Sequence, residues 1–467
     1  MLAPLDLLEQ LQARLDETLG SLPWDSGEGL ASLVLGLPNA PGLPPELSGP
    51  RFGLLHGRRR ELRAGYGIAA QWRAAGPNRM LGLGAKARTL APLWQQLDPD
   101  ETGFHGFALL GFAADPNPPH SPLAQPSAGN GLPNALLWVP ELALWGLQDQ
   151  AAVILTTRLP ARREELRRRW MGWLARLAQT LAEQAPEPLT PGPLQHLGSL
   201  PGLRDWQGLV DATLGEIEQG AIEKAVLSRR VGLRGRRSFD LRRLQGVLTW
   251  LFPSCQVVRI AHGGISFVAA TPERLLRVRG RQVEVDAIAG TAARSASSTQ
   301  DAALTDCLIR SDKDRREHAV VVEALRLALA GCCTELRVPT QPQVLQLHNA
   351  QHLWTPMSAR LAEDRDLFDL ADVLHPTPAT NGQPRHAALD WIRNTEPTGR
   401  GWYTGAAGII EPDLSGELWV LLRCAEVEGN EARLYAGAGI VAGSNPLNEW
   451  RETGHKLSAM ATALRFA

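Results

Sequence analysis

Residues 221–233 read AIEKAVLSRRVGL, a stretch in which Ala225 and Leu227 alternate with Lys224, Val226 and Ser228. Alternation of this kind is typical of a β-strand, because successive side chains point to opposite faces of a sheet. We therefore predict a strand over this stretch. Lys224 lies on one of its faces, either at a strand edge in water or inside the fold.

Lysine is rare in this chain. Of 48 basic residues only Lys86, Lys224, Lys313 and Lys456 are lysines, which leaves 48 − 4 = 44 arginines. Arginine stays protonated in proteins, whereas the amine of a buried lysine can be tuned toward neutrality and act as a base. A retained lysine is therefore a candidate for chemistry. Lys86 is set aside because its segment, LGLGAKARTL, has no other feature, and the other three are judged by their neighbours.

Composition limits the class of protein. The 467 residues are 44% hydrophobic and 21% charged, as in soluble globular proteins, and the formal net charge is −1. Such a chain has no global field that recruits nucleic acid or an anionic membrane, so neither is an expected partner. The five cysteines lack the paired spacing of a zinc site or a disulfide framework, which predicts a reducing, cytoplasmic location. There is no run of about 18 apolar residues, so we expect no membrane-spanning segment.

The first 200 residues carry the weakest motifs. The N-terminus predicts an amphipathic helix and not a signal peptide, since leucine recurs at helical spacing at Leu5, Leu8, Leu11 and Leu15. Residues 161–184 predict a basic helix, for which a solvated arginine face is favoured over a grip on phosphate. We divide the chain into 1–200, a divergent N-terminal part of the fold, and 201–467, a catalytic region, and expect the two to form one body.

A glutamate follows the next apolar strand. In ISFVAATPERLLRVRG (265–280), Glu273 comes directly after Thr-Pro, where a cleft can hold it. Burial there would raise its pKa and make it a general acid, whereas the alternative is a surface ion pair with Arg274 or Arg277. In VEVDAIAGTAARS (283–295), Gly290 and Thr291 are expected to end a strand. Gly290 leaves the backbone unshielded and Thr291 adds a hydroxyl, so the pair could contact the polar groups of a ligand or simply form a turn.

Two helices each place two acids on one face. Ser311 is expected to cap a helix that carries Asp314 and Glu317 at i and i+3, and Asn445 or Ser444 a helix that carries Glu449 and Glu452. Acids in a first turn also suit the helix dipole, and Glu452 with Lys456 could be an ordinary helix ion pair. If the helices face each other, the four carboxylates make an all-oxygen site for a hard cation such as Mg²⁺.

The chain resembles the chorismate-utilising enzymes in an ordered series of segments: KAVLSRR, ATPERLL, AIAGT, SDKDRREHAVVVEAL, HLWTPMSARL, LHPTPATNGQP, RGWYTGAAGII, LLRCAEV and YAGAGIVAGSNPLNEWRET. Within that family it most resembles isochorismate synthases of the menaquinone type, and the match is dense over 205–467. The resemblance implies a large single α/β (α+β) chorismate-binding fold, with two packed β-sheets, helices on the outside and one Mg²⁺-dependent site. Ala406 departs from the family pattern, which more often has proline in this loop.

The resemblance also implies a role for each matching residue. Lys224 corresponds to the general base and Glu273 to the general acid. Glu317 and Glu452 correspond to Mg²⁺ ligands, with Asp314 and Glu449 contributing directly or through waters. The residues that would line the chorismate pocket are Gly290, Thr291, His318, His375, Tyr403, Arg423, Gly439 and Lys456, and the two histidines have the least defined roles.

The implied activity is that of an isomerase, isochorismate synthase. Mg²⁺, Arg423 and Lys456 would neutralise and orient the two carboxylates of chorismate. Neutral Lys224 would accept a proton from the water that attacks C2, and protonated Glu273 would supply one to the departing C4 hydroxyl.

Two positions separate this chain from other members of the family. Aminodeoxychorismate synthases carry a nucleophilic lysine where this chain has Ala289, and anthranilate synthases carry glutamine where it has Lys224. Neither activity is therefore expected, and no glutamine amidotransferase subunit. The remaining alternative is salicylate synthase, which shares Lys224 and Glu273 and then expels pyruvate. We expect a monomer whose product feeds a quinone rather than a siderophore, and the intact acid, base and carboxylates argue against a catalytically silent binding protein.

Overall fold

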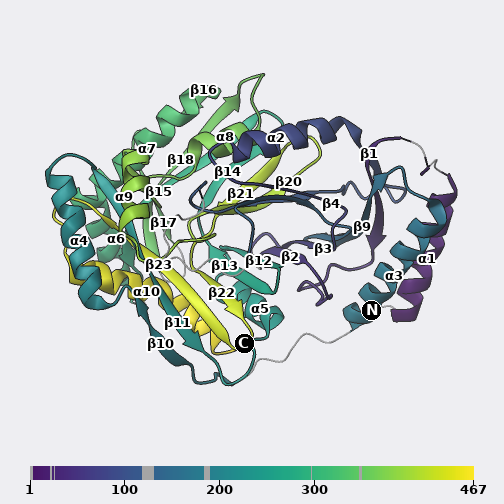
Figure 1. Cartoon of the computed structure of the whole chain (residues 1–467), viewed down its shortest axis with the longest axis horizontal. Coiled ribbons are helices and arrows are strands. Elements are labelled where there is room, and N and C mark those ends of the chain that lie inside the picture. Colours follow the sequence, from purple (N-terminus) through teal and green to yellow (C-terminus); the bar gives the residue numbers. More distant parts are fainter. Residues whose placement is uncertain are drawn as a thin grey trace.

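The computed structural model describes residues 4–21, 24–25, 27–117, 131–182, 190–295, 297–346 and 350–467. Within these ranges the chain forms a thirteen-stranded and a ten-stranded β-sheet, with helices on the outside (Figure 1). The helices are α1 (Pro4–Ser21), α2 (Arg79–Leu90), α3 (Arg163–Ala182), α4 (Leu203–Glu218), α5 (Leu241–Leu251), α6 (Ser298–Arg310), α7 (Asp312–Ala330), α8 (Leu367–Leu374), α9 (Arg385–Thr395) and α10 (Pro446–Leu464), with a short 3-10 turn at Ala91–Leu93.

The larger sheet runs, in spatial order, β10 (Gln195–Leu200), β11 (Lys224–Arg234), β23 (Glu431–Ile440), β22 (Cys424–Glu428), β13 (Ile265–Thr271), β12 (Gln256–His262), β2 (Arg51–His56), β3 (Glu61–Tyr66), β8 (Leu142–Leu147), β9 (Gln150–Leu159), β1 (Gly29–Leu37) and β5 (Trp94–Leu97). The two-residue strand β19 (Gly382–Gln383) pairs with β11. The predicted strand at 221–233 is thus β11, near one end of the sheet.

The smaller sheet runs β16 (Cys333–Arg337), β18 (Ala350–Leu361), β15 (Gln282–Ala293), β14 (Arg274–Arg279), β21 (Gly416–Val420), β20 (Ala406–Ile410), β6 (Ala108–Phe112), β7 (Ala135–Val139) and β4 (Ala70–Ala74), and β17 (Gln343–Gln346) pairs with β18. Apolar side chains from both sheets, among them Phe52, Phe267, Leu109 and Trp138, form one buried cluster between the layers. The predicted fold class, two packed sheets with outer helices, is confirmed.

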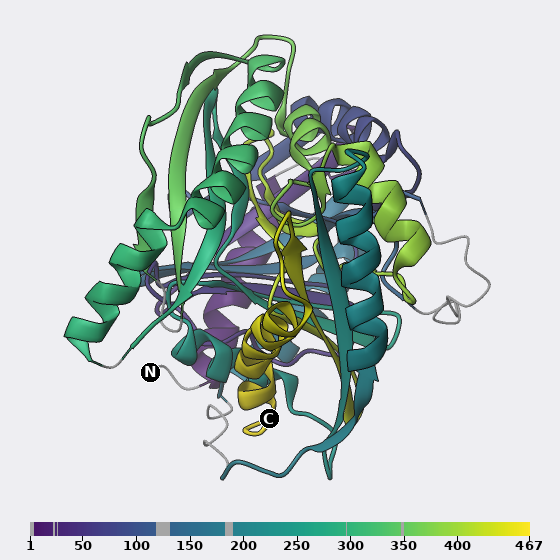
Figure 2. The ribbon, with the colours of Figure 1, turned by 90° about the vertical axis from the view of Figure 1, so that its left-hand side faces the viewer.

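Outer helices cover the remaining faces. α2, α7 and α8 pack on the smaller sheet, whereas α5 and α10 cover one part of the larger sheet and α1 and α3 another. Figure 2 views the molecule from the side on which α7, in green, and α10, in yellow, both lie. The basic helix predicted at 161–184 is α3, and its apolar side chains Leu166, Trp170, Trp173, Leu174 and Leu177 are all buried.

In both sheets a block of strands from the first 200 residues adjoins a block of later strands. β2 pairs with β12 in the larger sheet, and β6 pairs with β20 in the smaller one. The described part of residues 1–200 therefore supplies strands to the sheets that hold the later motifs. The boundary at residue 200 itself stays a prediction. Among the described helices none has both the length and the apolar character to cross a membrane.

Candidate active site

A cavity of about 290 Å³ opens where strands cross from one sheet to the other. Its wall includes parts of β11, β15 and β23 and the N-terminal halves of α7 and α10. It also includes two connections between the sheets, one at Pro272 and Glu273 and the other at Leu422 and Arg423. Eleven of the fourteen predicted site residues line it: Glu273, Gly290, Thr291, Asp314, Glu317, Tyr403, Arg423, Gly439, Glu449, Glu452 and Lys456. The geometry therefore gathers most of the predicted site into one place.

Glu273 lies at the first of these connections. β13 ends at Thr271 in the larger sheet and β14 begins at Arg274 in the smaller one, so Pro272 and Glu273 bridge the two layers. The backbone is fixed on both sides, because Glu273 N donates to Oγ1 of Thr271 over 3.2 Å and Glu273 O accepts from Val420 N over 2.9 Å. The apolar strand followed by Thr-Pro thus delivers the carboxyl to the cavity.

The Glu273 carboxyl is held in its acid form by its surroundings. The residue is 8% exposed, and burial raises its pKa to about 7. The positive charges of Lys224 and Lys456 work in the opposite direction, and the negative charge of Asp286 adds to the increase. A carboxyl that titrates near neutrality can donate a proton and recover it, which is what general acid catalysis requires.

Lys224 is buried beside a carboxylate. It is the first residue of β11, is 1% exposed, and its Nζ donates to Oε1 of Glu317 over 2.7 Å. It does not form part of the cavity surface, which it reaches through Glu317. Gly439, on the neighbouring strand β23, leaves room for the pair of Lys224 and Glu317. A Cβ at this position would lie 2.9 Å from Cε of Lys224 and 3.0 Å from Oε1 of Glu317. The expected role of Gly439 thus has a steric basis.

Three of the four predicted metal carboxylates, Glu317, Glu449 and Glu452, are each paired with one of the three lysines that the sequence singled out. Lys313 Nζ lies 3.3 Å from Glu449 Oε1, and Lys456 Nζ lies 2.7 Å from Glu452 Oε1. Burial and the neighbouring charge of Glu452 raise the pKa of Glu449 despite Lys313.

These four side chains suit a hard cation in their chemistry. All their donor atoms are oxygens, and the repulsion that acts on Glu449 is what a divalent cation relieves. In the described parts of the chain, however, no three of them are already gathered at coordinating distance. The magnesium site stays a prediction.

Arg423 lines the cavity and has a buried donor without a partner. It follows β21 at the second connection between the sheets, with a positive φ of 49°, and its buried Nη1 has no hydrogen-bond partner. A buried guanidinium nitrogen without a partner is costly, so an anionic ligand would satisfy it. Across the cavity, Lys456 Nζ donates to the carbonyl oxygen of Gly437 over 3.0 Å, and the ring of Tyr403 stacks on Tyr435 with centroids 5.4 Å apart.

Besides Lys224, two predicted residues do not line the cavity, His318 and His375. His318 Nε2 lies 2.8 Å from Oγ1 of Thr355, and His375 Nε2 lies 2.8 Å from the carbonyl oxygen of Thr404. Burial lowers the pKa of both, that of His375 to about 3. These contacts hold both imidazoles beside the cavity walls, and substrate binding by the two histidines stays a prediction.

The cavity also includes residues that were not predicted, among them His352 and Lys313. His352 lines the wall with Nδ1 3.0 Å from Oγ1 of Thr291, and burial lowers its pKa to about 3. The sequence feature that could have identified His352 is its position as the first residue of the HLWTPM segment. Lys313 was flagged as a rare lysine but was given no role. The strand expected to end at Gly290 in fact continues to Ala293, because Gly290, with a φ of 75°, forms a bulge that points the backbone at Asp314.

A family profile described as chorismate binding enzyme matches residues 46–465. The chain belongs to this family. Among its curated relatives, the chorismate-binding chain is 40% identical over 263 residues to the salicylate biosynthesis isochorismate synthase of Pseudomonas aeruginosa, and 36% identical over 264 residues to the isochorismate synthase MenF of Bacillus subtilis. Each alignment covers 56% of this chain and 55% of the relative, so the chain spans about half the length of these relatives.

The fold of this chorismate-binding enzyme matches a solved structure over nearly its whole length. The structure of MenF, the menaquinone-specific isochorismate synthase of Escherichia coli, superposes with a TM-score of 0.78 at 27% identity. The superposition covers 98% of this chain and 99% of the other. The described residues 1–200 thus belong to the same architecture as the later motifs, although their sequence carries few of them.

Proposed function

We propose that the protein is an isochorismate synthase, which isomerises chorismate to isochorismate by adding water at C2 and losing the C4 hydroxyl as water. The observation that carries this proposal is that a buried acid that titrates near neutrality, Glu273, lines the cavity, and a buried amine, Lys224, lies behind its wall and contacts the lining residue Glu317. The relatives that share its sequence are named isochorismate synthases, and the sequence resemblance points the same way.

The chain's own residues account for binding and proton transfer. Arg423 would pair with one carboxylate of chorismate through its unpartnered Nη1, and Lys456 would neutralise the other. Glu273 would protonate the C4 oxygen as the C–O bond breaks, and Lys224 would accept the proton of the water whose oxygen bonds to C2. One water enters and one leaves, so the atoms balance and no oxidant is needed.

The ion pair between Lys224 and Glu317 has a consequence for this chemistry. In an ion pair the lysine is an ammonium group, which has no free electron pair, so Lys224 can act as the base only after it has given up a proton and this pair is broken. Glu317, Glu452, Glu449 and Asp314 are proposed to hold Mg²⁺, which would supply positive charge for the substrate carboxylate and compete with Lys224 for Glu317.

Two neighbouring activities fit the cavity less well. Ala289 lies in the cavity wall at the position where aminodeoxychorismate synthases carry their lysine nucleophile, so no covalent intermediate is expected there. Lys224 stands where anthranilate synthases have glutamine, so a reaction with ammonia is not expected either. Neither reaction, nor an amidotransferase partner, is proposed.

The test is the product formed from chorismate in the presence of Mg²⁺, separated by chromatography, with and without ammonium. We expect isochorismate without pyruvate, and the same result when ammonium is added. Salicylate together with stoichiometric pyruvate would replace the proposal with salicylate synthase, and an ammonium-dependent product would replace it with an aminating activity. We also propose that the product is used to make menaquinone. The proposed location of the protein is the cytoplasm, and its proposed oligomeric state is a monomer.

A further inference from the structure

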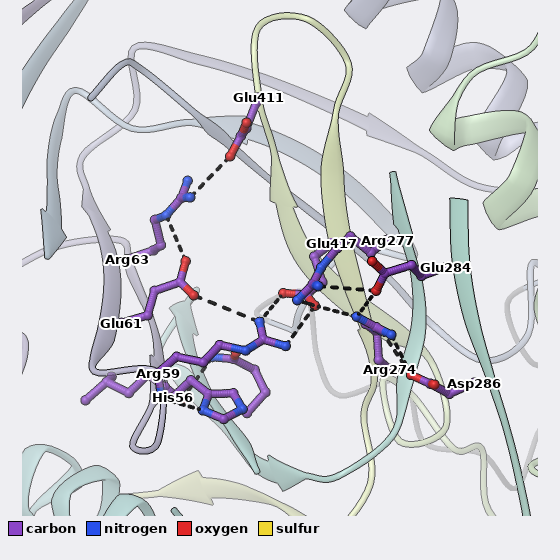
Figure 3. Close-up of polar contacts among 12 residues, drawn as sticks. His56, Arg59, Glu61, Arg63, Arg274, Arg277, Glu284, Asp286, Glu411 and Glu417 are labelled. Carbon is purple, nitrogen blue, oxygen red and sulfur yellow. Dashed lines mark hydrogen bonds and ion pairs between the residues drawn. The ribbon is translucent and has the colours of Figure 1, made fainter. Parts of the chain in front are cut away.

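A network of ion pairs begins one residue after the proposed general acid. Figure 3 shows Arg59, Arg274, Arg277, Glu284, Asp286 and Glu417 joined by charged contacts across β14, β15 and β21 and the turn between β2 and β3. These six residues are called the ion network below. Most of it is shielded from water, since the side chains of Arg274 and Asp286 are 13% and 12% exposed. Burying this many charges costs free energy, and this cost is offset only where each charge has a partner of opposite sign. The contacts within the ion network provide these partners.

Arg274 is the centre of the ion network. Its Nε and Nη2 each lie 3.0 Å from Oδ2 of Asp286, and its Nη1 lies 2.8 Å from Oε2 of Glu284 and 3.5 Å from Oε1 of Glu417. Three carboxylates therefore hold one guanidinium, and the two contacts with Asp286 fix its orientation. Arg274 directly follows Glu273 in the chain and is the first residue of β14, so the ion network anchors the strand that begins at the acid.

Asp286 connects this network to the cavity. Its other oxygen, Oδ1, accepts from Nε1 of Trp354 over 2.8 Å, so both carboxylate oxygens are engaged. Asp286 and Ile288 are two apart on β15 and point to the same face of the sheet, and Ile288 lines the cavity. The Asp286 carboxylate is thus one side chain away from the cavity wall.

We propose that Asp286 is a positioning residue for the general acid: it retains the Arg274 guanidinium in the ion network and places a fixed negative charge near the Glu273 carboxyl. This inference rests on the proposed function, because it assigns Glu273 the role of acid. It gives a role to residues that neither the sequence motifs nor the metal and substrate contacts had assigned.

The charges around Glu273 explain the need for such a residue. Lys224 from β11, Lys456 from α10 and Arg423 from the second connection all face it with positive charge, and the neutral phenol of Tyr403 lies on the same wall. Three cations favour the carboxylate, which cannot donate a proton. Asp286 from β15 is the negative group that opposes them. Without it, Arg274 would also lose the partner that holds it by two contacts.

The first 200 residues contribute to the same arrangement. Arg59, from the turn between β2 and β3, contacts Glu417 with Nη1 at 2.8 Å and Nη2 at 3.3 Å, and Arg277 adds a contact of 2.6 Å. These contacts orient Glu417 towards Arg274. The N-terminal part of the chain thereby helps to hold the residue that follows the acid.

The test compares Asp286→Asn with Glu284→Gln. Both substitutions remove one carboxylate from Arg274 with little change in size, but Glu284 is 44% exposed and is not among the groups that act on Glu273. Protonation of Glu273 is followed by infrared difference spectroscopy against Glu273→Gln, and the pH profile of kcat/KM with chorismate is measured in parallel. We expect Asp286→Asn to lower the titration midpoint of Glu273, and the alkaline limb of the profile, by about one pH unit, and Glu284→Gln to leave both in place.

The two readouts separate the possible outcomes. An unchanged infrared midpoint in Asp286→Asn, or an equal shift in Glu284→Gln, would overturn the proposal for Asp286. A wild-type infrared band without any isochorismate formed would instead overturn the proposed function. Asp286→Ser, which is smaller and has the same predicted shift, serves where asparagine prevents folding, and Arg60→Gln, from the exposed pair Arg60–Asp149, controls for the loss of a surface charge.

Discussion

Nζ of Lys224 lies 2.7 Å from Oε1 of Glu317, and the lysine side chain is only 2% exposed. The pair joins the proposed base to a proposed metal ligand, so replacing either residue disturbs both. Removing one partner of a buried pair leaves an uncompensated charge, at a cost of about 3–5 kcal/mol.

The first prediction uses this pair to separate folding from catalysis. Lys224→Ala should abolish turnover and also lower the unfolding temperature, because Glu317 loses its partner. Lys224→Arg keeps a positive charge beside Glu317 but cannot act as a base, so we expect it to unfold closer to wild type and yet lose activity on the order of 100- to 10,000-fold. Activity is measured as isochorismate formed and folding by thermal denaturation. Normal turnover in either variant contradicts the assigned base.

The second prediction concerns the pH dependence of stability. Glu273 has a pKa raised from 4.5 to about 7, so the folded state binds its proton more tightly than the unfolded state does. This contribution is fully present below pH 4.5 and is lost as pH rises through about 7. Glu273→Gln, which cannot ionise, should therefore gain stability over wild type of roughly 3 kcal/mol at alkaline pH and little in acid. Urea denaturation at several pH values measures the difference, and a difference that does not change with pH would refute the assigned burial cost.

The same carboxyl sets the third prediction, on activity. The acid must be protonated, so kcat/KM should be retained below the pKa of about 7 and should fall above it. In Glu273→Gln we expect a loss on the order of 100- to 10,000-fold with chorismate binding preserved. The pH profile of the wild type and the affinity of the variant, measured by calorimetry, test the two halves of this expectation. A profile that keeps rising through neutral pH is incompatible with Glu273 as the acid.

Local patterns were enough to place the elements that carry several of the predicted site residues. The alternation around Lys224 and the caps at Ser311 and Asn445 are confirmed as β11, α7 and α10. The two histidines could not be placed in this way. His318 and His375 lie within matching motifs, but their direction depends on partners far away in the chain, Thr355 and Thr404.

The ion network shows the same limit on a larger scale. Arg59 and Glu417 are separated by 358 positions, and their contact arises because β2 and β21 lie in different sheets that pack on each other. Nothing local to either residue indicates the other. For the first 200 residues, the place of each strand in the two sheets likewise depends on pairing with later strands such as β12 and β20.

The fourth prediction tests the space around the base. Gly439→Ala places a methyl group 2.9 Å from Cε of Lys224 and 3.0 Å from Oε1 of Glu317, and both atoms are the ends of side chains that can shift. We therefore expect the protein to fold while kcat falls at least tenfold, roughly the effect of a small misplacement of a catalytic group. Gly208→Ala, on α4 with nothing within 4 Å, is the matched control and should keep full activity. Equal activity in the two variants would show that Gly439 imposes no constraint.

The last prediction concerns the proposed metal. A cation that binds only the folded protein raises the unfolding temperature by mass action, so Mg²⁺ should stabilise the wild type and a chelator should reverse the effect, with activity following both. Glu449→Gln relieves the repulsion from Glu452 and should itself raise the unfolding temperature without Mg²⁺, while reducing the further gain that Mg²⁺ provides. Glu323→Gln, a substitution on the exposed side of α7, is the control and should respond to Mg²⁺ as the wild type does. Calorimetry of Mg²⁺ binding to the same three proteins gives an independent readout. If Glu449→Gln binds Mg²⁺ as tightly as Glu323→Gln, the carboxylates of α10 do not hold the cation, and the positive charge for the substrate must come from Arg423 and the three lysines alone.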